Sequence, residues 1–330
     1  MASERGTKAK TRMVVAALIV AVVFVGISIP MMRLVGRRGE LREIPWIKVT
    51  GPIQETITFE NGDVTLAGTL DLPAGEGPFP ALVTIHGSPP LTRNDRYNLY
   101  MSDFFLQHGF AVLRYDKRGA GESTGTYVNP GDWNLVGGVS RFAEVSTAKF
   151  NDLANDAIAG VEYLKTLDYI DPDMIGVIGF SQGGWIAPHA ASKSDSVAFS
   201  VALSGTTATI GQEMYYSDLV EHGETDISLE EASNMARDVF KGAHGYDPLL
   251  LLEAINVPCL WILGGQDRSI PVPLTIEIID SLVADQGKDF SYVYYPNMHH
   301  GWKDVDTAGL YPVLNDALEW LEEKFPGRIH

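Results

Sequence analysis

The chain has 330 residues, of which 45% are hydrophobic and 20% are charged. This length accommodates one α/β domain of roughly 250 residues together with a further segment. The formal net charge of −17 argues against a nucleic-acid partner, because binding to phosphates requires clustered Lys and Arg side chains. The single cysteine, Cys259, lies in an apolar run, so we expect a buried core residue and no intramolecular disulfide bond.

The N-terminal segment combines basic residues with a long uncharged stretch. Residues 13–32 carry no charge, and about 20 residues at a helical rise of ~1.5 Å span a hydrocarbon core of ~30 Å. We therefore predict a basic tail at 1–12, a transmembrane anchor at 13–32 and a linker at 33–50. A cleaved signal sequence is the alternative, since Gly26-Ile27-Ser28 offers a small-residue cleavage site. Basic residues flank the stretch on both sides, and we expect the folded domain to lie outside the cytoplasm.

The remainder of the chain, residues 51–330, shows the pattern of an α/β domain. Two stretches of β-forming residues flank Asn61-Gly62, which predicts an antiparallel hairpin. After Pro80, short apolar runs alternate with longer segments of helical periodicity, and this alternation predicts a parallel sheet flanked by helices. We expect strands at 54–60, 64–72, 81–85, 111–115, 175–180, 197–203, 257–263 and 290–295. We expect helices near 99–108, 152–167, 183–192, 273–284 and 309–324.

Residues 206–253 interrupt this alternation. The segment is longer than a simple crossover between strands and is rich in acidic residues from Glu213 to Glu231. We predict a small helical cap inserted into the domain. A solvated helical insertion without a role in substrate binding is the alternative.

A G-x-S-x-G motif, Gly179-Phe180-Ser181-Gln182-Gly183, lies directly between a predicted strand and a predicted helix. A serine in so tight a turn takes a strained backbone conformation, and the two glycines let the strand and the helix approach each other. The hydroxyl then projects above the edge of the sheet. We predict that Ser181 is a nucleophile, and an ordinary glycine-rich turn is the alternative interpretation.

A serine nucleophile needs a base beside it and an acid that orients the base. Asp267 and His300 each follow a predicted strand through a short loop, at the carboxyl edge where parallel sheets place their sites. We predict Asp267 as the acid and His300 as the base, in the chain order serine, acid, histidine. Asp304 and Asp306 compete with Asp267 but lie after the histidine. His299 competes with His300, which we prefer because Gly301 leaves room for its ring to swing toward the serine.

Acyl transfer also needs N–H donors for the oxygen that becomes negative in the tetrahedral intermediate. The backbone N–H of Gln182 follows the nucleophile at a helix N-terminus and is the first predicted donor. The second comes from the loop that begins at His86. Prolines lack an N–H, so Ser88 is the predicted donor in this loop and Gly87 is the alternative. No histidine pair has the H-x-x-x-H spacing of two ligands on one helical face, so we expect no metal and no cofactor.

Several motifs along the chain, taken together, resemble the bacterial α/β-hydrolases of the serine aminopeptidase-like and acyl esterase group. The resemblance covers about residues 54–325 and implies the α/β-hydrolase fold, with a mostly parallel eight-stranded sheet flanked by helices, a small helical cap and no cofactor. It also implies that Asp116 to Ser123 form a structural turn near the site, without a catalytic role. The motifs are His86-Gly87-Ser88, Arg114 to Ser123, Asp171-Pro172, Gly179 to Trp185, Gly264 to Asp267 and His300-Gly301.

The reaction expected from these residues is hydrolysis of a carboxylic ester or thioester of a small-molecule acyl substrate, through an acyl-enzyme intermediate. An aminopeptidase or amidase acting on small peptides is one alternative, because the acidic cap could hold the ammonium group of such a substrate. A non-catalytic, membrane-tethered binding protein that keeps the hydrolase fold is another.

Overall fold

The computed structural model describes residues 33–35, 41–43, 53–75, 77–131, 139–222 and 227–329. The chain divides into two units, Met1–Lys48 and Val49–His330. In the first unit, strands β1 (Arg33–Val35) and β2 (Leu41–Glu43) pair antiparallel within the predicted linker. The predicted tail and anchor at 1–32 lie outside the described residues. Among the residues that are described, no helix is long and apolar enough to cross a membrane.

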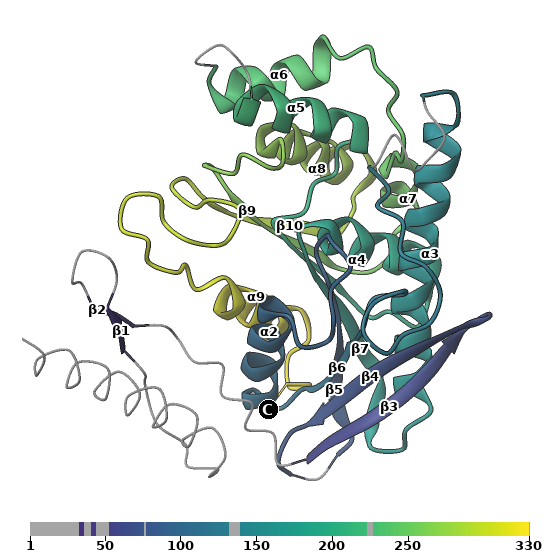
Figure 1. The fold of residues 1–330 in the computed structure, drawn as a ribbon. Coiled ribbons are helices and arrows are strands. Elements are labelled where there is room, and N and C mark those ends of the chain that lie inside the picture. The colour runs from purple at the N-terminus through teal and green to yellow at the C-terminus, as the bar shows by residue number, and fades with distance from the viewer. Residues whose placement is uncertain are drawn as a thin grey trace, which may run out of the picture. The chain divides into compact units, whose positions relative to one another are not determined.

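The second unit is built on an eight-stranded sheet with the strand order β10-β9-β8-β7-β5-β6-β4-β3 (Figure 1). Strands β3 and β4 form the predicted antiparallel hairpin, and Gly62 takes a φ of 59° in its turn. Strand β4 pairs antiparallel with β6, and the pairs from β6 to β10 are parallel, so the prediction of a mostly parallel sheet is confirmed. The strands are β3 (Ile53–Asn61), β4 (Val64–Leu72), β5 (Phe79–Ile85), β6 (Ala111–Tyr115), β7 (Ile170–Phe180), β8 (Ser200–Leu203), β9 (Cys259–Gly264) and β10 (Phe290–Tyr295).

Helices cover both faces of this sheet, as Figure 1 shows. Successive side chains of a strand point to opposite faces. Ala81 and Val83 of β5 join the core formed with α3 and α4, whereas Leu82 joins the core formed with α2 and α9. Burial on both faces explains why the central strands are continuous apolar runs in the sequence. The helices are α2 (Arg96–Gln107), α3 (Val139–Lys165), α4 (Gln182–Lys193), α8 (Val272–Gln286) and α9 (Val313–Lys324).

Helices α3 and α9 begin four or more residues from the predicted start, whereas α2, α4 and α8 begin within three residues of it. Helix α3 starts at Val139 instead of 152, because Phe142 and Phe150 pack into the core on the α4 side of the sheet. Helix α9 starts at Val313 instead of 309. The segment before it is held in turns, where the Asp304 side chain accepts the N–H of Thr307 at 2.8 Å.

In the described part of the segment 206–253 lie α5 (Ile210–His222), α6 (Leu229–Asp238) and the greater part of α7 (Leu249–Ala254). Helices α5 and α6, which we call the cap, pack on each other through a small apolar cluster of their own, including Tyr216 and Ala236. They lie at the top of Figure 1, on the same side of the molecule as α8. The cap is therefore a small layer added to the main core.

Candidate active site

The turn between β7 and α4 holds Ser181 in a strained conformation. Its φ of 57° and ψ of −117° lie outside the regions that L-residues favour. A Cβ atom at Gly179 would lie 2.0 Å from the carbonyl oxygen of Gly183, and one at Gly183 would lie 2.3 Å from that of Ile85. Both glycines are thus required for the close approach of strand and helix. The turn is fixed further by the N–H of Ser181, which donates to Leu203 O at 2.9 Å.

Ser181, His300 and Asp267 form one line of hydrogen bonds. The Nδ1 atom of His300 lies 2.8 Å from Asp267 Oδ2, and its Nε2 atom lies 2.9 Å from Ser181 Oγ. A carboxylate only accepts hydrogen bonds, so Nδ1 carries the proton and Nε2 is free to accept from the serine hydroxyl. Asp267 is 1% exposed, and its Oδ1 atom accepts the N–H groups of Ser269 and Ile270 at 2.8 and 3.2 Å. These bonds fix the carboxylate in the orientation that holds the ring.

The residues that compete with His300 and Asp267 in the sequence have other partners. The ring of His299 accepts the N–H of Gly301 through Nδ1 at 2.8 Å, which shapes the turn around His300. Asp304 uses its Oδ1 atom to hold the turn before α9. The backbone carbonyl of His300 accepts from Ser204 Oγ at 3.0 Å, so the loop that carries His300 is also anchored to the end of β8.

The loop after β5 approaches the nucleophile closely. A Cβ atom at Gly87 would lie 3.3 Å from the Cβ of Ser181 and from the carbonyl oxygen of Phe180. Ser88 follows and is exposed, while Gln182 is buried at the start of α4, where a backbone N–H has no partner within the helix. The structure thus packs the start of the loop that carries Ser88 against Ser181 and against the first turn of α4.

A cavity of about 300 Å³ adjoins this loop. Gly87, Ser88, Tyr97, Asn98 and Phe180 are among the residues that line it. The ring of Tyr97 stacks on that of Phe180, with 3.9 Å between the centroids. The Asn98 side chain is fully buried, and neither its amide nitrogen nor its oxygen has a hydrogen-bond partner among the described residues. The amide nitrogen and oxygen of Asn98 are thus buried without a hydrogen-bond partner among the described residues, in a residue that lines the cavity beside the loop after β5.

Lys117 is a residue of the site that the sequence did not reveal. It follows β6 and is 2% exposed. Its ammonium group donates to Gly87 O at 2.5 Å, Pro89 O at 3.1 Å and Gln182 Oε1 at 3.0 Å. Burial lowers the pKa of Lys117 to about 7, against the opposing effect of the Asp95 charge. The only signal in the sequence is a lysine directly after a buried strand, within the turn that the resemblance describes as structural.

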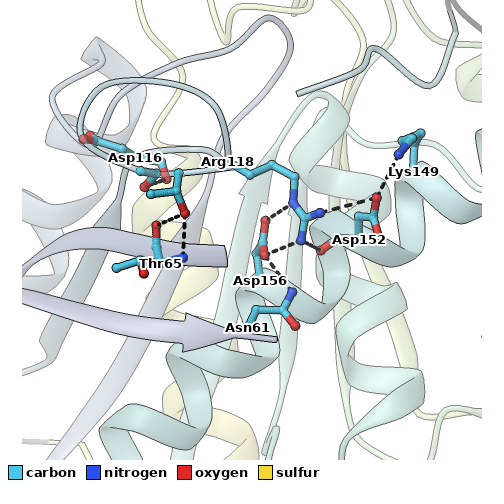
Figure 2. Close-up of polar contacts among 9 residues, drawn as sticks. Asn61, Thr65, Asp116, Arg118, Lys149, Asp152 and Asp156 are labelled. Carbon is cyan, nitrogen blue, oxygen red and sulfur yellow. Dashed lines mark hydrogen bonds and ion pairs between the residues drawn. The ribbon is translucent and has the colours of Figure 1, made fainter. Parts of the chain in front are cut away.

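The rest of that turn is anchored by ionic and polar contacts to its neighbours. Arg118 binds Asp156 of α3 through Nε and Nη2, each at 2.7 Å from a carboxylate oxygen (Figure 2). Asn61 at the end of β3 donates to the same carboxylate at 2.8 Å. On the other side, Asp116 accepts the backbone N–H groups of Arg93 and Glu122, both at 2.8 Å. These contacts connect the turn to the β3–β4 hairpin, to α3 and to the segment before α2.

α/β-Hydrolases have a parallel sheet in which a central strand ends in a strained serine. Their acid and base lie on loops after later strands. The described part of the chain has this fold. The profile of the prolyl oligopeptidase family matches residues 141–328, and the chain belongs to that family. The profile of acetyl xylan esterases matches residues 56–204. Within the described ranges, no group of three or more His, Cys, Asp or Glu side chains is placed to hold a metal ion.

The chain is similar to an esterase and to an acylamino-acid-releasing enzyme. Esterase EstD of Thermotoga maritima is 25% identical over 239 residues, which cover 64% of this chain and 53% of EstD. Acylamino-acid-releasing enzyme 1 of Oryza sativa is 21% identical over 227 residues, which cover 67% of this chain and 27% of that enzyme. The chain thus spans about half or less of the length of these relatives. An esterase structure from Pyrococcus furiosus shares the fold, with a TM-score of 0.59 at 19% identity over 90% of this chain and 100% of that one.

Proposed function

We propose that the protein hydrolyses carboxylic esters or thioesters, with Ser181 as nucleophile, His300 as general base and Asp267 as the acid that orients the base. The observation that carries this proposal is the unbroken line of hydrogen bonds from Ser181 Oγ through His300 to Asp267 Oδ2. In this arrangement His300 has the tautomer that can accept the proton of the Ser181 hydroxyl. The carboxylate of Asp267, which holds the ring, is buried away from water.

The reaction would proceed in two halves. Ser181 Oγ attacks the acyl carbonyl carbon while His300 Nε2 takes the hydroxyl proton, and the same nitrogen then gives that proton to the leaving alcohol or thiol. Water next attacks the acyl-enzyme, again losing its proton to His300, and the carboxylic acid leaves as Ser181 regains a proton. The N–H groups of Ser88 and Gln182 would bind the oxyanion of both tetrahedral intermediates.

The cavity beside the oxyanion loop supports a substrate with a polar group close to the reacting carbonyl. Its volume of about 300 Å³ suits a small group, and Asn98, whose buried amide has no hydrogen-bond partner among the described residues, is one of the residues that line it. A hydroxyl or carboxamide on the substrate would satisfy both atoms. We therefore include small polar substituents in the proposed substrate class.

One carboxyl group of the cap, that of Glu213, is relevant to the choice between an ester and an aminopeptidase substrate. Burial, with a further contribution from the charge of Asp267, raises the pKa of Glu213 on α5 to about 8. At neutral pH this side chain is mostly a neutral acid. It therefore offers little attraction for the ammonium group that an aminopeptidase must bind.

Labelling with a fluorophosphonate tests the nucleophile. We expect one label at Ser181 of the folded wild-type protein and none in Ser181→Ala. Ser192→Ala is the matched control, because Ser192 lies near the other end of α4 and donates to His189 O at 2.7 Å. An unlabelled, folded wild type would overturn the proposal. The hydrolysis rates of p-nitrophenyl esters are then compared with those of amino-acid p-nitroanilides, and this comparison distinguishes a preference for esters from a preference for peptides.

We also propose attachment to a membrane through residues 13–32, with the hydrolase domain outside the cytoplasm. The support is the length of the uncharged stretch and the basic residues around it. Fractionation of cells that express the full chain, compared with a chain that starts at Arg33, tests it. Recovery of both in the same fraction would contradict it.

A further inference from the structure

Lys117 occupies an unusual position for a lysine. Its side chain runs from the end of β6 under the loop that follows β5, and only 2% of the residue is exposed. All three of its hydrogen-bond partners are neutral oxygens: two backbone carbonyls and the side-chain amide of Gln182. The ring of Tyr127 lies 4.7 Å from the ammonium nitrogen and adds a cation–π contact. Burial of a cation costs desolvation free energy. We therefore expect the buried Lys117 to have a functional role.

The three partners belong to the two walls of the proposed oxyanion hole. Gly87 and Pro89 flank Ser88, whose N–H is the donor from the loop after β5. Gln182 is the residue whose backbone N–H is the other donor. An ammonium group has three N–H bonds in a fixed tetrahedral arrangement, and here two of them bind the loop and the third binds the helix start. Lys117 thus bridges two segments that lie 93 to 95 residues apart in the sequence.

We propose that Lys117 is a positioning residue for the oxyanion hole, whose ammonium group clamps the 87–89 loop against the first turn of α4 so that the two N–H donors converge. The inference rests on the proposed function. Donors that are fixed before the reaction stabilise the developing charge without reorganising, which is why their spacing matters for the rate. Lys117 does not touch the substrate, so it should act on the transition state more than on substrate binding.

The charge of Lys117 is consistent with this role. Its pKa is lowered to about 7 by burial, and Asp95 before α2 opposes that shift. His86, which lies in the same loop, is buried and its pKa is lowered to about 3 by burial and by Lys117, so it stays neutral beside the ammonium group. A pKa of about 7 leaves Lys117 about half protonated at neutral pH, and the three hydrogen-bond partners described for it are neutral oxygens that do not cancel its charge.

The central test replaces Lys117 by methionine, which keeps the length of the side chain but loses the donors. We expect kcat for a p-nitrophenyl ester to fall at least ~10-fold, because loss of a single oxyanion donor costs 10²- to 10³-fold in known enzymes. KM should change less than about threefold. The inhibition constant of a trifluoromethyl ketone, which forms a tetrahedral oxyanion with the serine, should rise by the same factor as kcat/KM falls.

A second variant, Gln182→Met, removes the acceptor on the helix side and keeps the backbone N–H. We expect a several-fold fall in kcat with little change in KM, and we expect Lys117→Met/Gln182→Met to be only slightly slower than Lys117→Met alone. If Lys117→Met does not fold, the kcat of Gln182→Met decides whether the clamp proposal holds. Additive effects in the double variant, or an unchanged kcat in Gln182→Met, would overturn the clamp.

The matched control is Lys288→Met. Lys288 also donates to backbone carbonyls, including Ile255 O at 2.9 Å. It lies before β10, at the end of the sheet where the parallel strands begin, whereas Ser181 lies where β7 ends. It should lower stability without changing kcat or inhibitor binding. Failure of wild-type labelling at Ser181 would refute the proposed function. Normal labelling with a wild-type kcat and inhibition constant in folded Lys117→Met would refute the role of Lys117 alone.

Discussion

The phenolic hydroxyl of Tyr216 on α5 donates a hydrogen bond to the backbone carbonyl oxygen of Asp267, at 2.7 Å. Tyr216 is fully buried and belongs to the apolar cluster of the cap. The same bond therefore connects the cap to the loop that carries the proposed acid. Since the Asp267 carboxylate holds the ring of His300, the position of the cap and the geometry around Ser181 are coupled.

Removal of this bond should affect both stability and rate. Tyr216→Phe leaves the Asp267 carbonyl unpaired, so we expect a loss of about 1 kcal/mol in the free energy of unfolding and a several-fold lower kcat. Urea unfolding and ester kinetics measure the two effects. Tyr246→Phe is the matched control, because its buried hydroxyl finds no partner in the part of the chain that the structure describes. Equal losses in the two variants would contradict the coupling.

Substitution of the two adjacent histidines should lower kcat to very different extents. His300→Ala removes the ring that is bonded to Ser181 Oγ, and we expect kcat to fall at least about 10³-fold. His299→Ala loses the bond from the N–H of Gly301 and should slow the reaction only a few-fold. Steady-state rates on one p-nitrophenyl ester compare them. A larger loss in His299→Ala would reverse the assignment of the base.

Asn98→Leu should raise stability and change specificity together. The buried amide has no partner among the described residues, so an apolar side chain of similar size should increase the free energy of unfolding by about 1 kcal/mol. The ratio of kcat/KM for a hydroxylated acyl ester to that for its plain counterpart should fall roughly 10-fold. A destabilised variant with an unchanged ratio would show that the amide serves the fold instead of the substrate.

Buried histidines should make the fold sensitive to acid. Burial, with a smaller effect from Lys193, lowers the pKa of His189 from 6.5 to about 3. Between these values the unfolded chain binds a proton that the folded protein does not. Stability is therefore lost as the pH falls from 6.5 toward 3, at up to ~1.4 kcal/mol per pH unit for this group. Urea unfolding at pH 7, 5 and 4 should show a shallower dependence in His189→Gln, and identical slopes would count against this explanation.

Much of the fold and the three proposed catalytic side chains could be predicted because the signals are local. Alternating apolar runs and helical segments indicated the sheet, and Ser181, Asp267 and His300 each follow a strand. In a parallel sheet the carboxyl ends of the strands meet at one edge. Residues that follow different strands are therefore brought to the same edge, and the structure places these three side chains within hydrogen-bond distance of one another.

Other features depend on contacts between segments that carry no local signal. The early start of α3 depends on packing of Phe142 and Phe150 into the core, which outweighs weak helical periodicity. The preference for His300 over His299 rests on ring orientation, because the structure places the His300 ring within hydrogen-bond distance of Ser181 Oγ and Asp267 Oδ2, whereas the neighbouring Gly301 could only suggest it.

The sequence by itself determined the class of fold and the order of the chemically active residues, since both follow from periodicity and from motif spacing. Only the tertiary structure decided what Lys117, Asn98 and Tyr216 contact. A lysine after a strand has the same sequence pattern whether its ammonium group meets water or three buried oxygens. The partners of a side chain depend on which distant segments the fold brings around it, and that information is not contained in any local stretch of the chain.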